Sequence, residues 1–430
     1  MPDAVIVSAA RTAVGKAPRG TLRETAPEAL ATSAVREALA RVPALDPAEV
    51  EDLILGCAMP EGAQGLNIAR HVGLAAGLPV TASAMTVNRF CASGLQALAL
   101  ASQSIASGAT EIAIAGGLES MSAVPMIGFH FAPGPEIAEG YPQVFLNMGL
   151  TAEEVARRFD VSRAAQDAWA LRSHQRAAAA VAEGRFREQI APVEALETRV
   201  DRAGRPSVGR RLFIEDEGVR RDTDAAALAK LRPVFAEGGT VTAGNSSQMS
   251  DGAAALVVMS ADRAASLGLQ PLGRLVAFAT AGVPPEIMGI GPVEAVPKAL
   301  RKAGLALDDL AAIELNEAFA AQVVAVVRQL GLDEERVNPD GGAIALGHPL
   351  GATGAKLSVQ LLDGLGRRGA RYGMVTMCVG GGQGAAGIIE WLGGRMRRSE
   401  AARATVREAG LEPEDERSGD ADDVPDAAAA

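Results

Sequence analysis

The stretch MTVNRFCASGLQALALASQSIASGATEIAIAGG covers residues 85–117 and contains three predicted elements in a row. Residues 85–88 are typical of a short strand, and residues 91–107 carry the Ala/Leu-rich pattern of a helix. Residues 111–115 are typical of a second strand, which ends in two glycines. A strand, a helix and a strand in this order favour an α/β fold. Cys91 then lies where the first strand gives way to the helix.

A second stretch repeats this order. Val337-Asn338 precedes a loop, a helix predicted over residues 351–366 and a strand predicted over residues 372–379, just as Val87-Asn88 precedes the first loop, helix and strand. Such an echo indicates a duplicated α/β unit. The other predicted elements are strands at 3–8, 52–57, 272–280 and 310–315, helices at 27–41, 292–304 and 317–330, and either a strand or a helix start at 251–260.

Two segments differ in character from these units. Residues 118–244 hold Met and Pro clusters, predicted helices at 151–159 and 163–183, and charged stretches without a clear period. Ser162 is the expected N-cap of the longer helix. This segment is predicted to be an insertion that lies over the core. Residues 394–430 have too few large apolar side chains to pack, so a mobile tail is expected there.

The composition narrows the class of protein. A formal net charge of -11 argues against non-specific binding to nucleic acid or to an anionic membrane, although a local arginine cluster could still hold an anionic ligand. No apolar run reaches membrane-spanning length, and the first residues predict a strand and not a signal peptide. The three cysteines form no C-x-x-C pair, and no His/Cys/carboxylate cluster has metal spacing. A cytoplasmic protein without a metal is expected.

Two residues could support nucleophilic catalysis. Cys91 opens a predicted helix, where the helix dipole and unpaired N–H groups favour a thiolate, the nucleophilic form of cysteine. The alternative is a buried small side chain with no chemical role. His348 lies between Gly347 and Gly351 in a tight loop that could present an imidazole without burying it, and an imidazole can take a proton from a thiol. The alternative is an ordinary loop histidine.

Two further positions have a similar double interpretation. Cys378 ends a hydrophobic strand just before Gly380-Gly381-Gly382, where bare backbone can direct N–H groups at an anion. It could equally be a core cysteine. Asn316 follows the strand at 310–315, and its amide could either cap the next helix or hold a water or substrate oxygen.

One motif points to a different class of protein. Residues 382–387, GQGAAG, match G-x-G-x-x-G after a strand. A dinucleotide site would also need a further strand and an acidic residue about 20 residues later in a βαβ unit. The chain continues instead with IIEWL and a polar tail, so a dehydrogenase is rejected.

Taken together, the motifs resemble those of the thiolase family over about residues 3–392. The blocks that carry the resemblance, in the family's order, are VNRFCASGLQAL (87–98), TAGNSSQMSDGAAA (242–255), GIGP (289–292), NEAFA (316–320), GGAIALGHPLGATGA (341–355) and MCVGGGQGAA (377–386).

The resemblance implies a five-layer αβαβα fold of two similar halves with an inserted loop domain. The N-terminal thiolase domain would comprise residues 1–120 and 245–270, and the loop domain, which binds coenzyme A, residues 121–244. Residues 271–393 would form the C-terminal thiolase domain, and residues 394–430 the tail.

The resemblance also implies roles for five residues. Cys91 would take the acyl group as a thioester, and His348 would be the base that activates it. Cys378 would move the proton at the α-carbon of the acetyl unit, and Asn316 would hold a water that stabilises the enolate oxygen together with His348. The N–H groups of Cys91 and Gly380 would form the hole for the thioester oxygen.

Coenzyme A is implied as a substrate, with no permanently bound cofactor. The family pattern places its contacts at Arg220, Phe235, Ala243, Ser247, Met148, Ala318 and Phe319. Arg221 is our own addition, as a charge against phosphate. Asn147 stands where the short-chain biosynthetic thiolases have a histidine, which favours the degradative, broader-chain members, as does Ser246-Ser247-Gln248.

The leading prediction is therefore acetyl-CoA C-acyltransferase, which cleaves 3-ketoacyl-CoA with CoA into acetyl-CoA and a shortened acyl-CoA, in fatty-acid β-oxidation. The alternatives are an acetoacetyl-CoA thiolase that condenses two acetyl-CoA, and a non-catalytic CoA-binding subunit. The family implies a homodimer or homotetramer, with a β-oxidation hydratase/dehydrogenase as a candidate partner.

Overall fold

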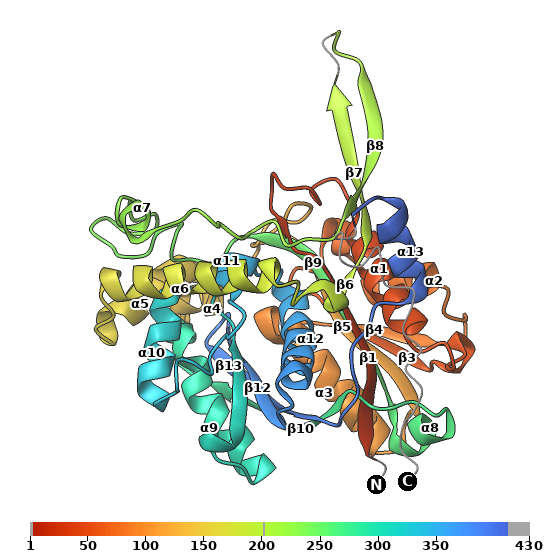
Figure 1. Cartoon of the computed structure of the whole chain (residues 1–430). Helices are drawn as coiled ribbons and strands as arrows, with labels where there is room; N and C mark the ends of the chain where they lie inside the picture. The colour runs from red at the N-terminus through yellow and green to blue at the C-terminus, as the bar shows by residue number, and fades with distance from the viewer. Residues whose placement is uncertain (1–2, 201–202, 412–430) are drawn as a thin grey trace.

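The computed structural model describes residues 3–200 and 203–411, built around one large mixed sheet (Figure 1). Its strands follow the order β11-β12-β13-β10-β1-β9-β5-β3-β4, with β2 and β6 paired beside this path. The strands of this sheet are β1 (Ala4–Thr12), β2 (Gly15–Lys16), β3 (Asp52–Gly56), β4 (Ser83–Val87), β5 (Ile112–Ser120), β6 (Ile190–Ala191), β9 (Ser250–Ser260), β10 (Gly273–Gly282), β11 (Leu310–Leu315), β12 (Tyr372–Val379) and β13 (Gln383–Trp391).

The pairing of the strands confirms the duplication. In the first half, β3 runs parallel to β5, β5 pairs antiparallel with β9, and β9 pairs antiparallel with β1. In the second half, β11 runs parallel to β12, β12 pairs antiparallel with β13, and β13 pairs antiparallel with β10. The two halves meet where Ile6 of β1 pairs with Gly273 of β10. The predicted duplicated α/β unit is therefore a repeated four-strand pattern.

Helices separate and cover the halves, which gives the five layers. Helices α1 (Pro27–Ala40) and α2 (Ile68–Ala76) pack on the outer face of the first half, and α9 (Gly291–Ala303) and α10 (Ala320–Leu330) on that of the second. Helices α3 (Ser93–Ala106) and α12 (Leu350–Arg368) form the middle layer and share one apolar core with strands of both halves.

The two middle helices cross in direct backbone contact. A Cβ at Gly94 of α3 would lie 2.6 Å from the Ala355 backbone nitrogen, and a Cβ at Gly354 of α12 would lie 2.3 Å from the Leu95 backbone nitrogen. Glycine at both positions is therefore what lets the helix after Cys91 lie against the helix after His348.

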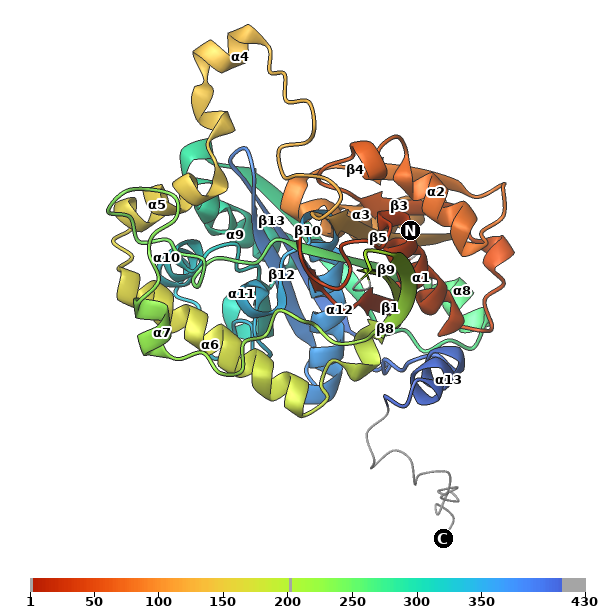
Figure 2. The same cartoon turned by 90° about the horizontal axis from the view of Figure 1, so that it is seen from above.

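The remaining helices, several of them in the loop segment (residues 121–244), surround this core. They are α4 (Pro135–Gly140), α5 (Met148–Arg158), α6 (Arg163–Ala182), α7 (Ala225–Ala229), α8 (Ala261–Ser266), α11 (Ala343–Leu346) and α13 (Glu400–Glu408). Figure 2 shows α4 standing off from the sheet. The Ser162 side chain accepts a hydrogen bond from Ala165 N at the start of α6, so the predicted N-cap is confirmed. The domain boundaries themselves stay predictions.

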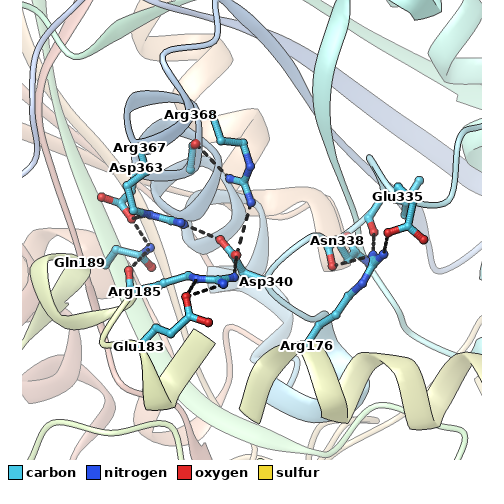
Figure 3. Close-up of polar contacts among 12 residues, drawn as sticks. Arg176, Glu183, Arg185, Gln189, Glu335, Asn338, Asp340, Asp363, Arg367 and Arg368 are labelled. Atoms are coloured by element: carbon cyan, nitrogen blue, oxygen red, sulfur yellow. Dashed lines mark hydrogen bonds and ion pairs between the residues drawn. The ribbon is translucent and has the colours of Figure 1, made fainter. Parts of the chain in front are cut away.

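An ionic cluster docks the end of α6 on α12 (Figure 3). Asp340 receives Arg185 Nη1 at 2.8 Å, Arg368 Nη2 at 3.3 Å and a further contact from Arg367. Burial opposes ionisation of Asp340, but Arg367 and Arg368 outweigh it and lower the pKa of this carboxyl. Charge therefore holds the loop segment against the second half.

The structure corrects one sequence-based expectation and decides two others. The charged stretch predicted to be irregular contains a projecting hairpin of β7 (Val193–Val200) and β8 (Pro206–Phe213) (Figure 1), in which Arg210 pairs with Glu194 across the strands. Residues 251–260 lie wholly in a strand, and residues 383–387 of the rejected dinucleotide motif lie in β13.

The tail prediction for residues 394–430 is wrong where the structure describes it. Met396, Ala402 and Val406 are buried, and Ser399 donates to Glu37 of α1 at 2.7 Å. Three buried apolar side chains and the hydrogen bond from Ser399 to Glu37 therefore hold α13 against the core, although no long apolar run in the sequence predicts this helix. Residues 412–430 lie outside the described part of the chain. Among the described residues, no helix is both long and apolar enough to span a membrane.

Candidate active site

A strained turn positions the Cys91 side chain after β4. Phe90 has a positive φ of 41°, in the left-handed region that a residue with a side chain rarely adopts. The Asn88 side chain accepts from Phe90 N at 2.7 Å, and the Ser93 hydroxyl accepts from Arg89 N at 2.8 Å and donates to Phe90 O at 2.6 Å. Three hydrogen bonds thus fix the turn that carries Cys91, and α3 begins at Ser93.

The surroundings of Cys91 correct the expected charge of its thiol. Cys91 lies in one buried apolar cluster with Ala58, Met121 and Leu350. Burial raises the pKa of the Cys91 thiol to about 12, although the N–H groups of Gly380 and of Cys91 itself lower it in part. Desolvation therefore outweighs the helix N-terminus, and the resting thiol is protonated.

The hydrogen bonds of His348 define which ring nitrogen can act as a base. The hydroxyl of Thr353 donates its single hydrogen to Pro349 O at 2.9 Å, so at 2.6 Å from His348 Nδ1 it must accept. Nδ1 therefore carries the proton, and Nε2 offers a lone pair. Asn316 Nδ2 lies 3.2 Å from this Nε2 and donates to it.

The burial of His348 differs from the sequence-based expectation of an exposed imidazole. Only 4% of this residue is exposed. Burial, with a smaller effect of the charge of Lys356, lowers the pKa of His348 to about 3. The imidazole is thus neutral at physiological pH, which is the form that can accept a proton.

Asn316 contacts the site and does not cap a helix. Its backbone N–H donates to Thr376 O at 2.9 Å, which ties the residue directly after β11 to β12. Helix α10 begins only at Ala320, where Phe319 N donates to the Gln322 side chain, so the capping alternative is wrong. Within the described chain, the buried Asn316 Oδ1 has no hydrogen-bond partner, and an acceptor is therefore left over beside His348.

Cys378 and Gly380 come to the same place from the end of β12. Cys378 is fully buried, and burial, followed by the neighbouring Cys91, raises the pKa of its thiol. The Gly380 N–H faces the Cys91 sulfur, as does the N–H of Cys91 itself. The two amides predicted to form the oxyanion hole therefore converge on one point next to both thiols.

The predicted coenzyme A residues lie in two groups. The first group is Met148, Ala318, Phe319, Phe235 and Ser247, of which Met148 lies next to a site residue and the others are linked to one another. Met148 lies beside Gly380, where an added Cβ would be 3.8 Å from its sulfur, and Ser247 N donates to Ala318 O at 2.9 Å. The rings of Phe235 and Phe319 meet edge to face at 6.0 Å.

Arg220 and Ala243 are exposed and belong to the loop segment. Arg220 N donates to His174 Nδ1 at 3.2 Å, which anchors this part of the loop on α6. The charge of Arg221, which we expected to face phosphate, is instead paired with Glu215 at 2.8 Å.

Sequence reasoning missed Thr353, which orients the imidazole. Its position five residues after His348, just inside the following helix, is the signal that could have found it. Within residues 3–200 and 203–411, no group of His, Cys, Asp or Glu side chains is arranged to hold a metal ion.

Comparison with protein families decides the class. The family model described as "Thiolase, N-terminal domain" matches residues 4–262, and "Thiolase, C-terminal domain" matches residues 269–391. The chain belongs to the thiolase family. Thiolases are acyltransferases, so the protein is an enzyme of that class.

Individual relatives agree with this assignment. The chain is 54% identical to 3-ketoacyl-CoA thiolase of Bacillus subtilis (strain 168) over 390 residues, which cover 91% of the chain and 100% of the relative. It is 47% identical to 3-ketoacyl-CoA thiolase of Aeromonas hydrophila, covering 91% and 100%. The crystal structure of the Bacillus anthracis acetyl-CoA acetyltransferase matches with a TM-score of 0.82 at 41% identity, covering 91% and 99%. The thiolase fold expected from the sequence is confirmed.

Proposed function

We propose that this thiolase is a 3-ketoacyl-CoA thiolase of fatty-acid β-oxidation, with Cys91 as its covalent nucleophile. The observation that carries the proposal is that Cys91 of the first half converges with Cys378 and Gly380 of the second, while Leu350, two residues after His348, lies in the same buried apolar cluster as Cys91. The relatives named 3-ketoacyl-CoA thiolase support the choice of substrate.

The first half-reaction cleaves the carbon–carbon bond. Cys91 Sγ attacks the keto carbon of the substrate while its proton passes to His348 Nε2, whose lone pair is released by the Asn316 amide in this step. The bond between the keto carbon and the α-carbon then breaks. The acyl group stays on Cys91 as a thioester, and the departing acetyl-CoA enolate takes a proton from the Cys378 thiol.

The second half-reaction releases the acyl group. The thiol of CoA gives its proton to the Cys378 thiolate and attacks the acyl carbon. Cys91 leaves as a thiolate and recovers its proton from His348. Atoms and charges balance over the cycle, because each thiol and the imidazole end as they began.

The neutral resting state fits this sequence of steps. With thiol and imidazole pKa values of about 12 and about 3, proton transfer between them is unfavourable before the substrate binds. It becomes favourable when negative charge develops on an oxygen held by the N–H groups of Cys91 and Gly380. At the separate place of the enolate oxygen, the unpartnered Asn316 Oδ1 beside His348 supports a bound water, because a buried acceptor without a partner is costly.

Coenzyme A is proposed to enter from the loop segment. Met148, Phe235 and Phe319 give an apolar wall for the pantetheine, with Ser247 and Ala318 beside Phe319, and Ala243 is proposed as a further contact from the exposed part of the loop segment. Arg220, exposed farther along the loop segment, supplies a positive charge for the nucleotide end.

An acetoacetyl-CoA thiolase is the second candidate, favoured by the likeness to the Bacillus anthracis acetyl-CoA acetyltransferase. Thiolysis rates against a series of 3-ketoacyl-CoAs of increasing chain length separate the two. Turnover of substrates longer than four carbons is expected, and activity confined to the four-carbon substrate would reject the leading choice.

A homodimer or homotetramer is proposed for the assembly. Strand β4 lies at the end of the sheet path, and the neighbouring Leu66, Val80 and Met85 are exposed. An open strand edge flanked by apolar side chains is suited to pairing with a second copy. A monomer in sedimentation equilibrium would reject this. We also propose a cytoplasmic location, supported by the three unpaired cysteines.

A further inference from the structure

Glu119 at the end of β5 is a buried carboxylate that no step above uses. Its Oε2 accepts from Ala58 N and from Gly351 N, each at 2.8 Å. Its Oε1 accepts from Gln64 Nε2 at 2.7 Å and from Met59 N at 3.3 Å. Four neutral N–H donors thus surround a carboxylate of which 1% is exposed, and no cation forms an ion pair with it in the described chain.

The two backbone N–H groups that donate to Oε2 come from different halves of the molecule, and each lies at or next to a residue that clusters with Cys91. Ala58, from the first half, lies in the same buried apolar cluster as Cys91. Leu350, from the second half, belongs to the same cluster and immediately precedes Gly351. A single oxygen atom of Glu119 therefore hydrogen-bonds to both halves of the molecule, next to the apolar cluster that contains Cys91.

The same carboxylate is connected to the loops that carry the nucleophile and the base. Gly351 lies three residues after His348, so its hydrogen bond to Glu119 anchors the loop that carries His348, here called the base loop. On the other side, Ala58 O accepts from Asn88 Nδ2 at 3.0 Å, and Asn88 in turn holds Phe90 N. Hydrogen bonds and short backbone steps thus lead from the loop after His348, through Glu119, to the residue before Cys91.

Packing leaves little freedom for this arrangement to shift. A Cβ at Gly351 would lie 2.6 Å from the Cys57 Cα and 2.7 Å from Leu118 O, so the base loop rests on the backbone beside Glu119. The base loop and the strand ends are thus held by one carboxylate and one close backbone contact.

We infer that Glu119 is a positioning residue that sets the placement of the His348 loop relative to Cys91. The inference rests on the proposed function, since it concerns the transfer of a proton between these two groups. A displacement of about 1 Å between reacting groups can cost about 100-fold in rate. The fixed placement of the His348 loop relative to Cys91 therefore matters for turnover and much less for substrate affinity.

The substitution Glu119→Gln tests this directly. The amide keeps one accepting oxygen but turns an NH₂ group toward two N–H donors, which breaks one pair of bonds. Thiolysis kinetics are measured on protein shown by its melting curve to be folded at the assay temperature. We expect kcat to fall about tenfold or more while KM changes less than about threefold.

Glu37→Gln is the matched control. Glu37 is also a buried carboxylate, but it lies on the outer helix α1, where it holds Arg41 and Ser399. This variant is expected to lose stability and to keep the wild-type kcat. A Glu119→Gln enzyme with wild-type kcat, or equal losses of kcat in both variants, would overturn the inference.

A third variant keeps the test decisive if Glu119→Gln does not fold. Gln64→Ala removes the side-chain donor to Glu119 Oε1, together with the Gln64 bonds to Met59 O and from Ser120 N, so the carboxylate loses one anchor while both bonds to Oε2 remain. We expect a loss of kcat of about threefold at unchanged KM, and unchanged kcat would overturn the inference. A wild-type enzyme without thiolysis would instead reject the proposed function, so the two failures are distinguishable.

Discussion

The active site and the Asp340 cluster are both buried polar regions, but they handle charge in opposite ways. Around Asp340, three arginines lower the pKa of the carboxyl and keep it ionised (Figure 3). Around Cys91 and His348, burial shifts both pKa values toward the neutral forms. The charged cluster fixes the loop segment in place. In the neutral site, the Cys91 proton stays on its thiol until negative charge develops on the bound substrate, and only then does it pass to His348.

This difference predicts that changes at the site alter rate, whereas changes at the cluster alter stability. The largest effect is expected for Cys91→Ser, which replaces the nucleophile by a hydroxyl with a much higher pKa. Thiolysis should fall at least about 10³-fold, with CoA binding by calorimetry unchanged. Full residual activity would favour a non-catalytic CoA-binding subunit.

His348→Asn is expected to come next, with a fall in kcat of about 10²-fold or more because the general base is lost. The same variant should change the acid stability. A buried neutral histidine, with a pKa of about 3 when folded and 6.5 when unfolded, contributes stability that is present above pH 6.5 and lost as the pH falls toward 3. Urea unfolding of the variant should therefore depend less on pH than that of the wild type over this range. An identical pH dependence would show that the imidazole is not buried.

Asp340→Asn should leave kcat unchanged and lower the free energy of unfolding by about 2 kcal/mol, because three arginines lose their shared anion. The pKa of Asp340 is lowered in the folded protein, so its contribution is present above the unfolded value of 3.8 and is lost as the pH falls below it. Denaturant unfolding at neutral and acid pH checks both points. A fall in kcat without a loss of stability would break the distinction between the two regions.

The smallest effect is expected for Ser399→Ala, far from both regions. It removes the N-cap of α13 and one hydrogen bond to Glu37, which should cost about 1 kcal/mol of stability and no activity. A melting curve beside a kinetic assay measures both. No change in melting would contradict the docking of α13 described above.

Much of the fold could be predicted from the local pattern of apolar residues in the sequence. The strand, turn and helix around Cys91 and the duplicated unit could be predicted because apolar periodicity and glycines mark them in the sequence. The hairpin β7–β8 and helix α13 could not, since they are stabilised by cross-strand ion pairs and a few docking contacts with distant segments.

The site was predictable in its residue types and not in its electrostatics. Cys91 and His348 stood out by their positions in the motifs. Their burial depends on how the two halves close on each other, with Ala58 and Leu350 contributed from segments far apart in the chain. For the same reason, the contacts of Glu119 carried no separate signal in the sequence.

The central claim is that Cys91 carries the acyl group, and it is tested most directly by mass spectrometry. The wild-type enzyme is exposed briefly to an acyl-CoA without free CoA, quenched in acid and digested. An acyl adduct on the peptide that contains Cys91, removed again by added CoA, is the predicted result. An adduct on Cys57 or Cys378 instead, or thiolysis that proceeds without any adduct, would contradict the account.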